Sequence, residues 1–282
     1  MPGITLDALL RRDRIIILAS LAAMTLLAWA YLLSLGDMTA AVEKPMEAMD
    51  GMPGMDMSGM DMPGMPEAML APRAWRLGEA FLVLAMWSVM MVGMMLPSAA
   101  PMILLYARVG RHAASQGAPF AATGIFGSGY VAAWFLFSLV ATLGQWLLER
   151  ALLLTPMMES ASALFSGLVL LFAGLYQWTP LKHACLSKCR APVAFIQSEG
   201  GFRRERWGAF RMGLRHGLYC VGCCWPLMAL LFVGGVMNIL WIAALAIFVL
   251  VEKIMPGGQR LSQVAGAILV AAGAWLIIHG HS

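Results

Sequence analysis

The chain has 282 residues, of which 61% are hydrophobic and only 12% are charged, and its formal net charge is +4. A soluble globular domain usually carries about 25% charged residues, so this composition excludes a soluble globular fold and predicts a membrane protein. A small net charge in such a chain gives no reason to expect a nucleic-acid partner, and membrane lipids are the first partner to expect.

Seven apolar stretches are long enough to cross about 30 Å of hydrocarbon as helices. They lie at roughly 15–35, 79–106, 120–147, 160–177, 208–234, 238–254 and 261–279. We therefore predict an all-α fold, a polytopic membrane helix bundle of about seven transmembrane helices. The chain then divides into an N-terminal tail with a first anchor helix (1–35), a flexible Met-rich loop (36–74) and a six-helix membrane metal-binding domain (75–282).

The lysines and arginines predict the orientation of this bundle. With the N-terminus in the cytoplasm, 15 of the 19 basic residues fall on the cytoplasmic side, and the C-terminus is periplasmic. This predicts a multi-pass protein of the bacterial inner (cytoplasmic) membrane. A cleaved signal peptide is the alternative for the first stretch, but its apolar run exceeds the usual length of about 7 to 15 residues, which favours an uncleaved anchor.

The loop 36–74 contains the segment "DGMPGMDMSGMDMPGM", which is almost entirely Met, Asp, Gly and Pro. Gly, Pro and Asp oppose both helix and strand, so these methionines have no core to fill. Thioether sulfur is a soft, uncharged ligand that suits Cu(I), and Met-x-x-Met spacing lets a flexible chain wrap several sulfurs around one ion. A low-complexity linker and an oxidant sink are the alternatives. We predict periplasmic metal capture by Met52, Met55, Met57, Met60, Met62 and Met65.

The second apolar stretch carries a stripe of methionines in "MWSVMMVGMMLPSAAP". Met86, Met90 and Met94 share one helical face, and Met91 and Met95 form an adjoining stripe. Such a stripe could pass a soft cation along the helix by ligand exchange, but methionine also fills gaps in helix packing. We name Met90, Met91, Met94 and Met95 as candidate metal ligands.

The fifth stretch, "RMGLRHGLYCVGCCWPLMALL", places His216, Cys220, Cys223 and Cys224 at positions i, i+4, i+7 and i+8. One helical face therefore presents an imidazole and three thiols. Such a face can bind Cu(I) or Zn(II), or its cysteines can cycle between dithiol and disulfide. Packing is the plain alternative, because free cysteine is among the most commonly buried residues.

The segment after the fourth stretch reads "YQWTPLKHACLSKCRAPVAFI". Cys185 and Cys189 suit one face of a short helix, with His183 nearby and basic residues that favour the thiolate. This predicts a second metal-binding pair. A segment that binds lipid headgroups through its basic residues is a nearly equal alternative.

Three of these segments, in this order, resemble a bacterial family of predicted metal-binding integral membrane proteins. They are "MWSVMMVGMMLPSAAPMILLYARV", "YQWTPLKHACLSKCRAP" and "GLRHGLYCVGCCWPLM", and the resemblance covers about residues 75–280. Members encoded beside a tyrosinase are regarded as membrane copper chaperones for that enzyme. The resemblance implies a copper-handling membrane protein and implies the same Met, His and Cys positions as metal ligands; the Met-rich loop is not part of the family pattern.

Together these patterns predict a copper chaperone and not an enzyme. It would capture Cu(I) in the loop and pass it through the sites in the bundle to an acceptor or across the membrane. The expected acceptor is a copper-dependent oxidase resembling tyrosinase, or a periplasmic copper carrier. Zinc and silver are the other metals that such ligands accept, and the sequence gives no oligomeric state.

Two other functions remain open. The cysteines of the fifth stretch suit a membrane thiol-disulfide oxidoreductase, although that function needs no Met-rich loop. A structural subunit of a larger complex would carry no metal. The chain has no phosphate-binding "GxxxxGK[ST]" motif, which argues against an ATP-driven pump.

Overall fold

The computed structural model describes residues 15–36, 75–115, 122–154, 160, 162–202 and 205–280. These residues form helices, with one isolated β-bridge between Leu154 and Ser160 and no strand within the described part, which confirms the all-α prediction. The helices are Ile15–Gly36, α2 (Leu77–Ser115), α3 (Thr123–Arg150), α4 (Ala163–Tyr176), α5 (Pro180–Arg190), α6 (Pro192–Ser198), α7 (Arg206–Ala229), α8 (Leu231–Gly234), α9 (Ile239–Ile254) and α10 (Gly258–His279). The Met-rich stretch, with the six methionines predicted to capture metal, lies outside the described residues.

Five of the described helical stretches are long and apolar enough to cross a membrane. They are Ile15–Gly36, Leu77–Ala113, Thr123–Arg150, Arg206–Gly234 and Gly258–His279. A sixth results if α4 and α5 count as one span bent by 65°. Helix α9, predicted as a full span, has 16 residues, or about 24 Å at 1.5 Å per residue, so it is short for about 30 Å of hydrocarbon. The membrane character follows from these helices, while the count of seven and the orientation stay predictions.

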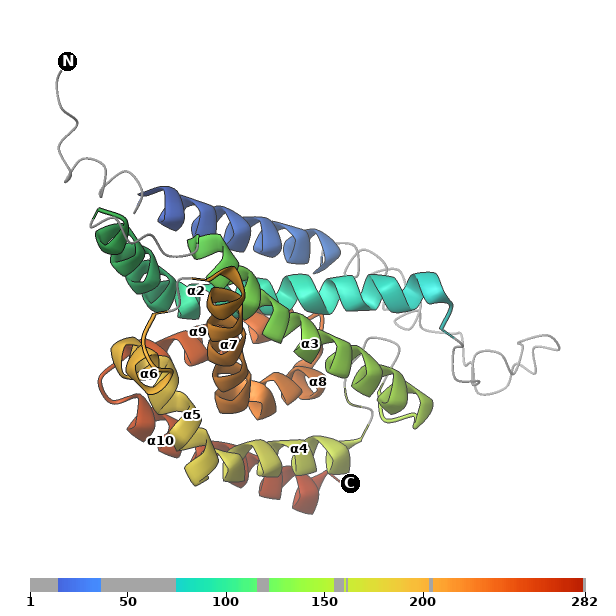
Figure 1. Ribbon diagram of the computed structural model, residues 1–282. Helices are drawn as coiled ribbons and strands as arrows, with labels where there is room; N and C mark the ends of the chain where they lie inside the picture. Colours follow the sequence, from blue (N-terminus) through green and yellow to red (C-terminus); the bar gives the residue numbers. More distant parts are fainter. Residues whose placement is uncertain are drawn as a thin grey trace, which may run out of the picture.

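Helix α2 is longer than the sequence predicts. It has 39 residues and includes Pro97 and Pro101 without ending there, so it extends about 58 Å. In Figure 1 it runs across the whole described bundle, and the helix Ile15–Gly36 lies beside it. The predicted span 79–106 therefore covers this helix from near its start but ends nine residues before its C-terminus.

Close packing at glycines joins two pairs of helices. Along α3 and α7, a Cβ at Gly213 would collide with the backbone carbonyl of Phe126. Along α4 and α10, a Cβ at Gly174 would lie 2.8 Å from the carbonyl oxygen of Gly266. Small residues let helix backbones approach closely, as is common between helices in membranes. Figure 1 shows α4 and α10 side by side at the edge of the bundle, with α3 and α7 nearer its centre.

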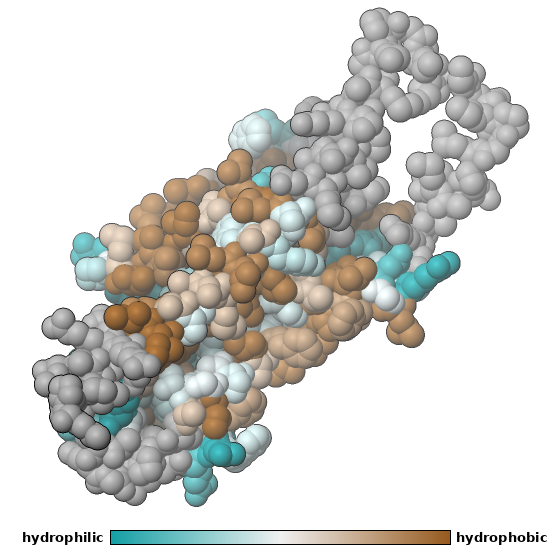
Figure 2. Space-filling view, turned by 90° about the horizontal axis from the view of Figure 1, so that it is seen from above, coloured by the Kyte–Doolittle hydropathy of each residue, from teal (hydrophilic) through white to brown (hydrophobic). Residues whose placement is uncertain are grey.

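Large apolar side chains cover the outside of the helices. Leu26, Val140 and Ile278 are each about two-thirds exposed or more, on three different helices. Figure 2 shows such apolar side chains over much of the described surface. An exposed apolar surface of this extent is typical of a protein whose surroundings are lipid.

The bend between α4 and α5 has a local cause. The Thr179 side chain caps α5 by accepting a hydrogen bond from the backbone N–H of Lys182 (3.3 Å), and Pro180 occupies the first helical position. A capped proline start suits the beginning of a new helix and not the continuation of an old one. The bend turns α5 toward α7, so that the cysteines of the two helices come together.

Candidate metal centre

The cysteine-bearing face of α7 points into the protein. His216, Cys220, Cys223 and Cys224 are each at most 3% exposed, and all three thiols are free. The thiols of Cys223 and Cys224 both donate to the backbone carbonyl of Cys220, at 3.1 and 2.9 Å. The predicted helical face therefore exists and is buried in protein, away from lipid.

Cys220 lies at the centre of a polar network. Its sulfur is 3.0 Å from the hydroxyl of Tyr130 in α3 and 2.9 Å from the ammonium of Lys253 in α9. The Lys253 ammonium also donates to the Ser98 hydroxyl of α2 at 3.0 Å. Three helices thus meet at this sulfur, and α2 joins the network through Lys253. Neither Tyr130 nor Lys253 was predicted from the sequence as part of the site. The signal for Lys253 was a Glu-Lys pair at the end of an apolar run, in "IFVLVEKI".

Helix α5 brings two more thiols to this face, and we call the five together the thiol cluster: Cys185, Cys189, Cys220, Cys223 and Cys224. Cys185 is 8% exposed, and the thiol of the half-buried Cys189 interacts with those of Cys220 and Cys223. The sequence predicted the two cysteine groups as separate sites, whereas the structure places them together.

A glycine and a proline in α7 make room for α5 and α4. A Cβ at Gly222 would lie 2.9 Å from the Cys185 sulfur, so this approach depends on the missing side chain. Pro226 has no N–H to donate to the carbonyl four residues earlier, which is that of Gly222. The hydroxyl of Tyr176 in α4 donates to this carbonyl instead, at 2.6 Å. The Gly222 carbonyl that Pro226 leaves without its helical partner thus receives a hydrogen bond from a neighbouring helix.

His216 lies in an aromatic environment one turn before Cys220. The ring centroids of Phe195, Tyr130 and Phe126 are 5.1, 5.9 and 6.2 Å from its own. Its Nδ1 atom is buried and has no hydrogen-bond partner among the described residues. A buried polar atom without a partner is unusual and marks a position where a ligand can bind. His183 of α5 also has a buried Nδ1 without such a partner, but its side chain is only half-buried.

The methionine stripe of α2 is as deeply buried as the cysteines. Each of its five members is at most 3% exposed: Met86, Met90, Met91, Met94 and Met95. They belong to the same continuous buried cluster as the cysteines of α7. The Tyr130 hydroxyl connects the two groups, because it also donates to the Met95 carbonyl at 3.0 Å. The structure therefore puts the stripe and the thiol cluster in one core.

A second buried polar group lies next to this core. Glu252 of α9 is fully buried and forms an ion pair of 2.6 Å with the equally buried Lys182 of α5. Lys182 and Ser262 both donate to the side-chain oxygen of Gln177, and the Ser262 bond measures 2.8 Å. The sequence analysis did not predict this ion pair, which ties α5 to α9 beside the thiol cluster.

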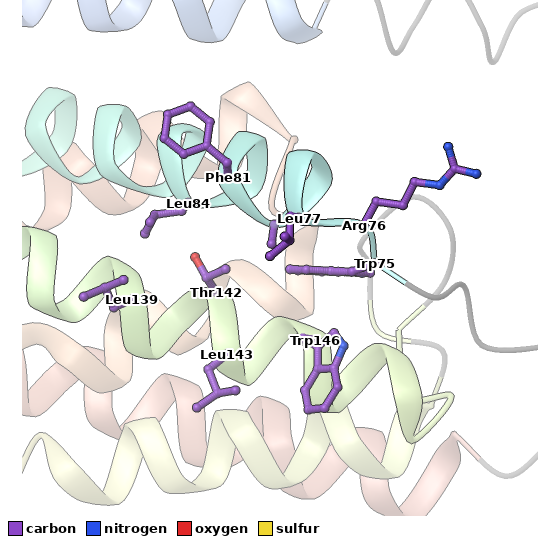
Figure 3. A pocket seen from close by; sticks show the side chains of 10 residues that line it. Trp75, Arg76, Leu77, Phe81, Leu84, Leu139, Thr142, Leu143 and Trp146 are labelled. Atoms are coloured by element: carbon purple, nitrogen blue, oxygen red, sulfur yellow. The ribbon is translucent and has the colours of Figure 1, made fainter.

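An apolar pocket between α2 and α3 is separate from the thiol cluster. It has a volume of about 460 Å³ and lies near the start of α2, as Figure 3 shows. None of the ten lining side chains carries a sulfur or an imidazole, and Arg76 points away from the opening (Figure 3). This pocket offers nothing to a soft metal ion.

Among the residues that the structure describes, no three His, Cys, Asp or Glu side chains already converge as a preformed metal site. The chemistry of the donors nevertheless fits one class of ion. Thiols and thioethers are soft ligands, which favour Cu(I) over hard cations such as Mg²⁺ and Ca²⁺.

Comparison with known proteins agrees with this donor set. The model of a family described as copper chaperone, PpoB2, matches residues 84–276, more than two-thirds of the chain. The chain belongs to this family. No curated protein and no solved structure matched it.

Membership of the copper chaperone family confirms the resemblance predicted from the sequence. The matched region includes most of α2 and all of α5 and α7, and so contains every cysteine and the methionine stripe. It begins after the Met-rich stretch, in line with the expectation that the stretch is not part of the family pattern. The protein is thus a copper-handling membrane protein, whose partners are copper-dependent proteins.

Proposed function

We propose that this copper chaperone binds Cu(I) inside the bundle with the thiol cluster and hands it to an acceptor. The observation that carries this proposal is the approach of α5 to the cysteine face of α7. A Cβ at Gly222 would lie 2.9 Å from the buried Cys185 sulfur, and the half-buried Cys189 interacts with the buried Cys220 and Cys223. Thiols that only pack in a core need no such convergence. A soft cation is what two or three adjacent sulfurs bind best.

Binding requires a small rearrangement of the thiols. The thiols of Cys223 and Cys224 both donate to the Cys220 carbonyl. To bind an ion together with Cys189 and Cys220, their sulfurs would have to turn toward those two residues. His216, with its free Nδ1 atom, is a further candidate ligand.

The methionines supply weaker sites on the path to the thiol cluster. Thioethers bind Cu(I) more weakly than thiolates, so the ion moves favourably from the Met-rich stretch through the stripe of α2 to the cysteines. The stretch then serves to capture Cu(I) in the periplasm, and the bundle in the inner membrane serves to hold it. The acceptor is a copper enzyme resembling tyrosinase or a periplasmic carrier, unless the ion crosses the membrane.

Copper stoichiometry of the purified full-length chain tests this proposal. The matched variants are Cys189→Ser, Cys223→Ser and the double variant, because serine keeps the size of the side chain and can still donate to a carbonyl. We expect each single variant to weaken Cu(I) binding and the double variant to abolish it. Unchanged copper binding in the double variant would refute the thiol cluster as the site.

The same contact supports a second candidate function. Cys189 next to Cys220 and Cys223 suits a thiol-disulfide oxidoreductase, in which two thiols lose two electrons and two protons to a partner disulfide and become a disulfide. This function predicts that the double serine variant loses disulfide exchange. It also predicts either that the wild-type chain binds no copper or that the double variant binds as much copper as the wild type. Measuring exchange and copper on the same samples separates the two functions.

A further inference from the structure

Lys253 is a buried cation in direct contact with the thiol cluster. Its side chain is only 7% exposed in the folded chain, and its ammonium lies 2.9 Å from the Cys220 sulfur. Burying a charge without a compensating partner is strongly unfavourable. The identity of its partner therefore decides the charge of the whole centre.

No carboxylate among the described residues compensates Lys253. Its chain neighbour Glu252 already pairs with Lys182 at 2.6 Å. The groups that face the ammonium are Ser98 from α2, Tyr130 from α3 and the α7 cysteines. Ser98 is neutral and uses its proton on the Met95 carbonyl, at 2.8 Å.

Cys220 is therefore the group in contact with Lys253 that can balance its charge as a thiolate. Its sulfur becomes an anion readily and lies 2.9 Å from the ammonium, and the Tyr130 hydroxyl, which donates to the Met95 carbonyl, lies 3.0 Å from the same sulfur. Charge-assisted hydrogen bonds of this kind are about twice as strong as neutral ones. When Cys220 binds an ion as a thiolate, the Lys253 ammonium at 2.9 Å therefore contributes one positive charge to the buried centre.

This pair has a consequence for the charge of the ion that the centre accepts. With two thiolates as ligands and one ammonium beside them, an ion of charge +1 makes the buried centre neutral. An ion of charge +2 leaves a net charge of +1, which is unfavourable in surroundings of low polarity. The protein's contribution to this net charge is the positive charge of Lys253 and the negative charges of Cys220 and one further cysteine.

We propose that Lys253 makes the thiol cluster selective for soft ions of single positive charge over soft ions of double charge. The inference rests on the proposed function, since it assumes that the thiol cluster binds metal. Lys253 does not itself bind the ion. It acts through the positive charge that it places beside Cys220.

Ag⁺ and Cd²⁺ are suitable probes because both are soft, both have the same number of electrons, and neither changes oxidation state. The full-length chain in lipid nanodiscs is equilibrated with a mixture of the two ions, and the bound ratio is measured by mass spectrometry of the metals. We expect Lys253→Met to lower the Ag⁺ to Cd²⁺ ratio about tenfold or more, because one unit of charge close to the ion is removed. Lys253→Arg keeps the charge and should keep most of the preference.

Two controls keep the outcome clear. Arg260→Met removes one positive charge from an exposed position of α10 and should leave the ratio unchanged. If Lys253→Met does not fold, the wild-type ratio is compared with that of an unstructured peptide with the sequence of residues 219–225; a preference no greater than the peptide's overturns the inference.

The results also distinguish this inference from the function on which it rests. A wild-type chain that binds neither ion through its cysteines would contradict the proposed function. A wild-type chain that binds Ag⁺ through its cysteines, with a ratio that Lys253→Met does not change, would contradict only the role of Lys253.

Discussion

The methionine stripe of α2 and the cysteine face of α7 are equally buried, yet their surroundings differ. The stripe lies in the apolar core, and the hydrogen bonds at Met95 involve its backbone carbonyl and not its sulfur. The Cys220 sulfur instead contacts a hydroxyl and an ammonium. Burial alone therefore does not distinguish a metal ligand from a packing residue, because both groups of residues are fully buried; the polar contacts of the Cys220 sulfur make the cysteine face the stronger candidate.

The largest effect should come from the cysteine face. Replacing Cys220 and Cys223 by serine is expected to weaken Cu(I) binding more than about 100-fold, since changes outside the ligand shell of metal sites alone typically weaken binding 10- to 100-fold. Competition with a Cu(I) chelator measures this change. A loss of less than tenfold would place the tightest site elsewhere in the chain.

The stripe should show a smaller effect on binding and almost none on folding. Met90→Leu with Met94→Leu keeps the side-chain volume, so we expect a loss of stability below about 1.5 kcal/mol per substitution. If the sulfurs are ligands on the path, Cu(I) transfer to the thiol cluster slows severalfold in stopped-flow measurements. An unchanged rate would leave the stripe with a packing role only.

The approach of α5 can be tested at Gly222. An added Cβ would lie 2.9 Å from the Cys185 sulfur and push this thiol aside, so Gly222→Ala should weaken Cu(I) binding severalfold. Stability should fall by less than about 1.5 kcal/mol, because the atom that must move ends a rotatable side chain. Gly144→Ala in α3 is the matched control, since a Cβ there meets no atom within 4 Å.

The smallest effect should come from the Met-rich stretch, and only under one condition. Changing its six capture methionines, Met52, Met55, Met57, Met60, Met62 and Met65, to leucine should lower copper uptake when copper is limiting and not when it is in excess. Uptake by whole cells at two copper concentrations measures this difference. An equal loss at both concentrations would indicate that the stretch supports the structure.

Much of the helical architecture could be predicted from hydrophobic length and periodicity. The spacing of His216, Cys220 and Cys224 correctly placed them on one buried face, because helical periodicity is a local property. The contact of Cys189 with that face could not be predicted, since it depends on the bend at Thr179 and Pro180 and on packing between distant segments.

The burial and the partners of the polar residues around the cysteines could not be predicted from the sequence either. Glu252 and Lys253 follow an apolar run, where charged residues usually mark the end of a span and face water. In the structure the two neighbours point to different partners, Lys182 and Cys220, and both are buried. A run of hydropathy gives no sign of such pairing, which depends on the residues that other helices contribute.

The hydrogen bond from the Tyr176 hydroxyl to the Gly222 carbonyl replaces a backbone hydrogen bond of α7 beside its cysteines. Elsewhere in a helix, a change of pitch breaks backbone hydrogen bonds of the helix itself. Here Pro226 has already removed one, and a side-chain hydroxyl from α4 has taken its place. Under the proposed function, the turn bearing Cys220 and Cys223 would adjust to an ion by exchanging a single tyrosine contact, with little change in the rest of the bundle.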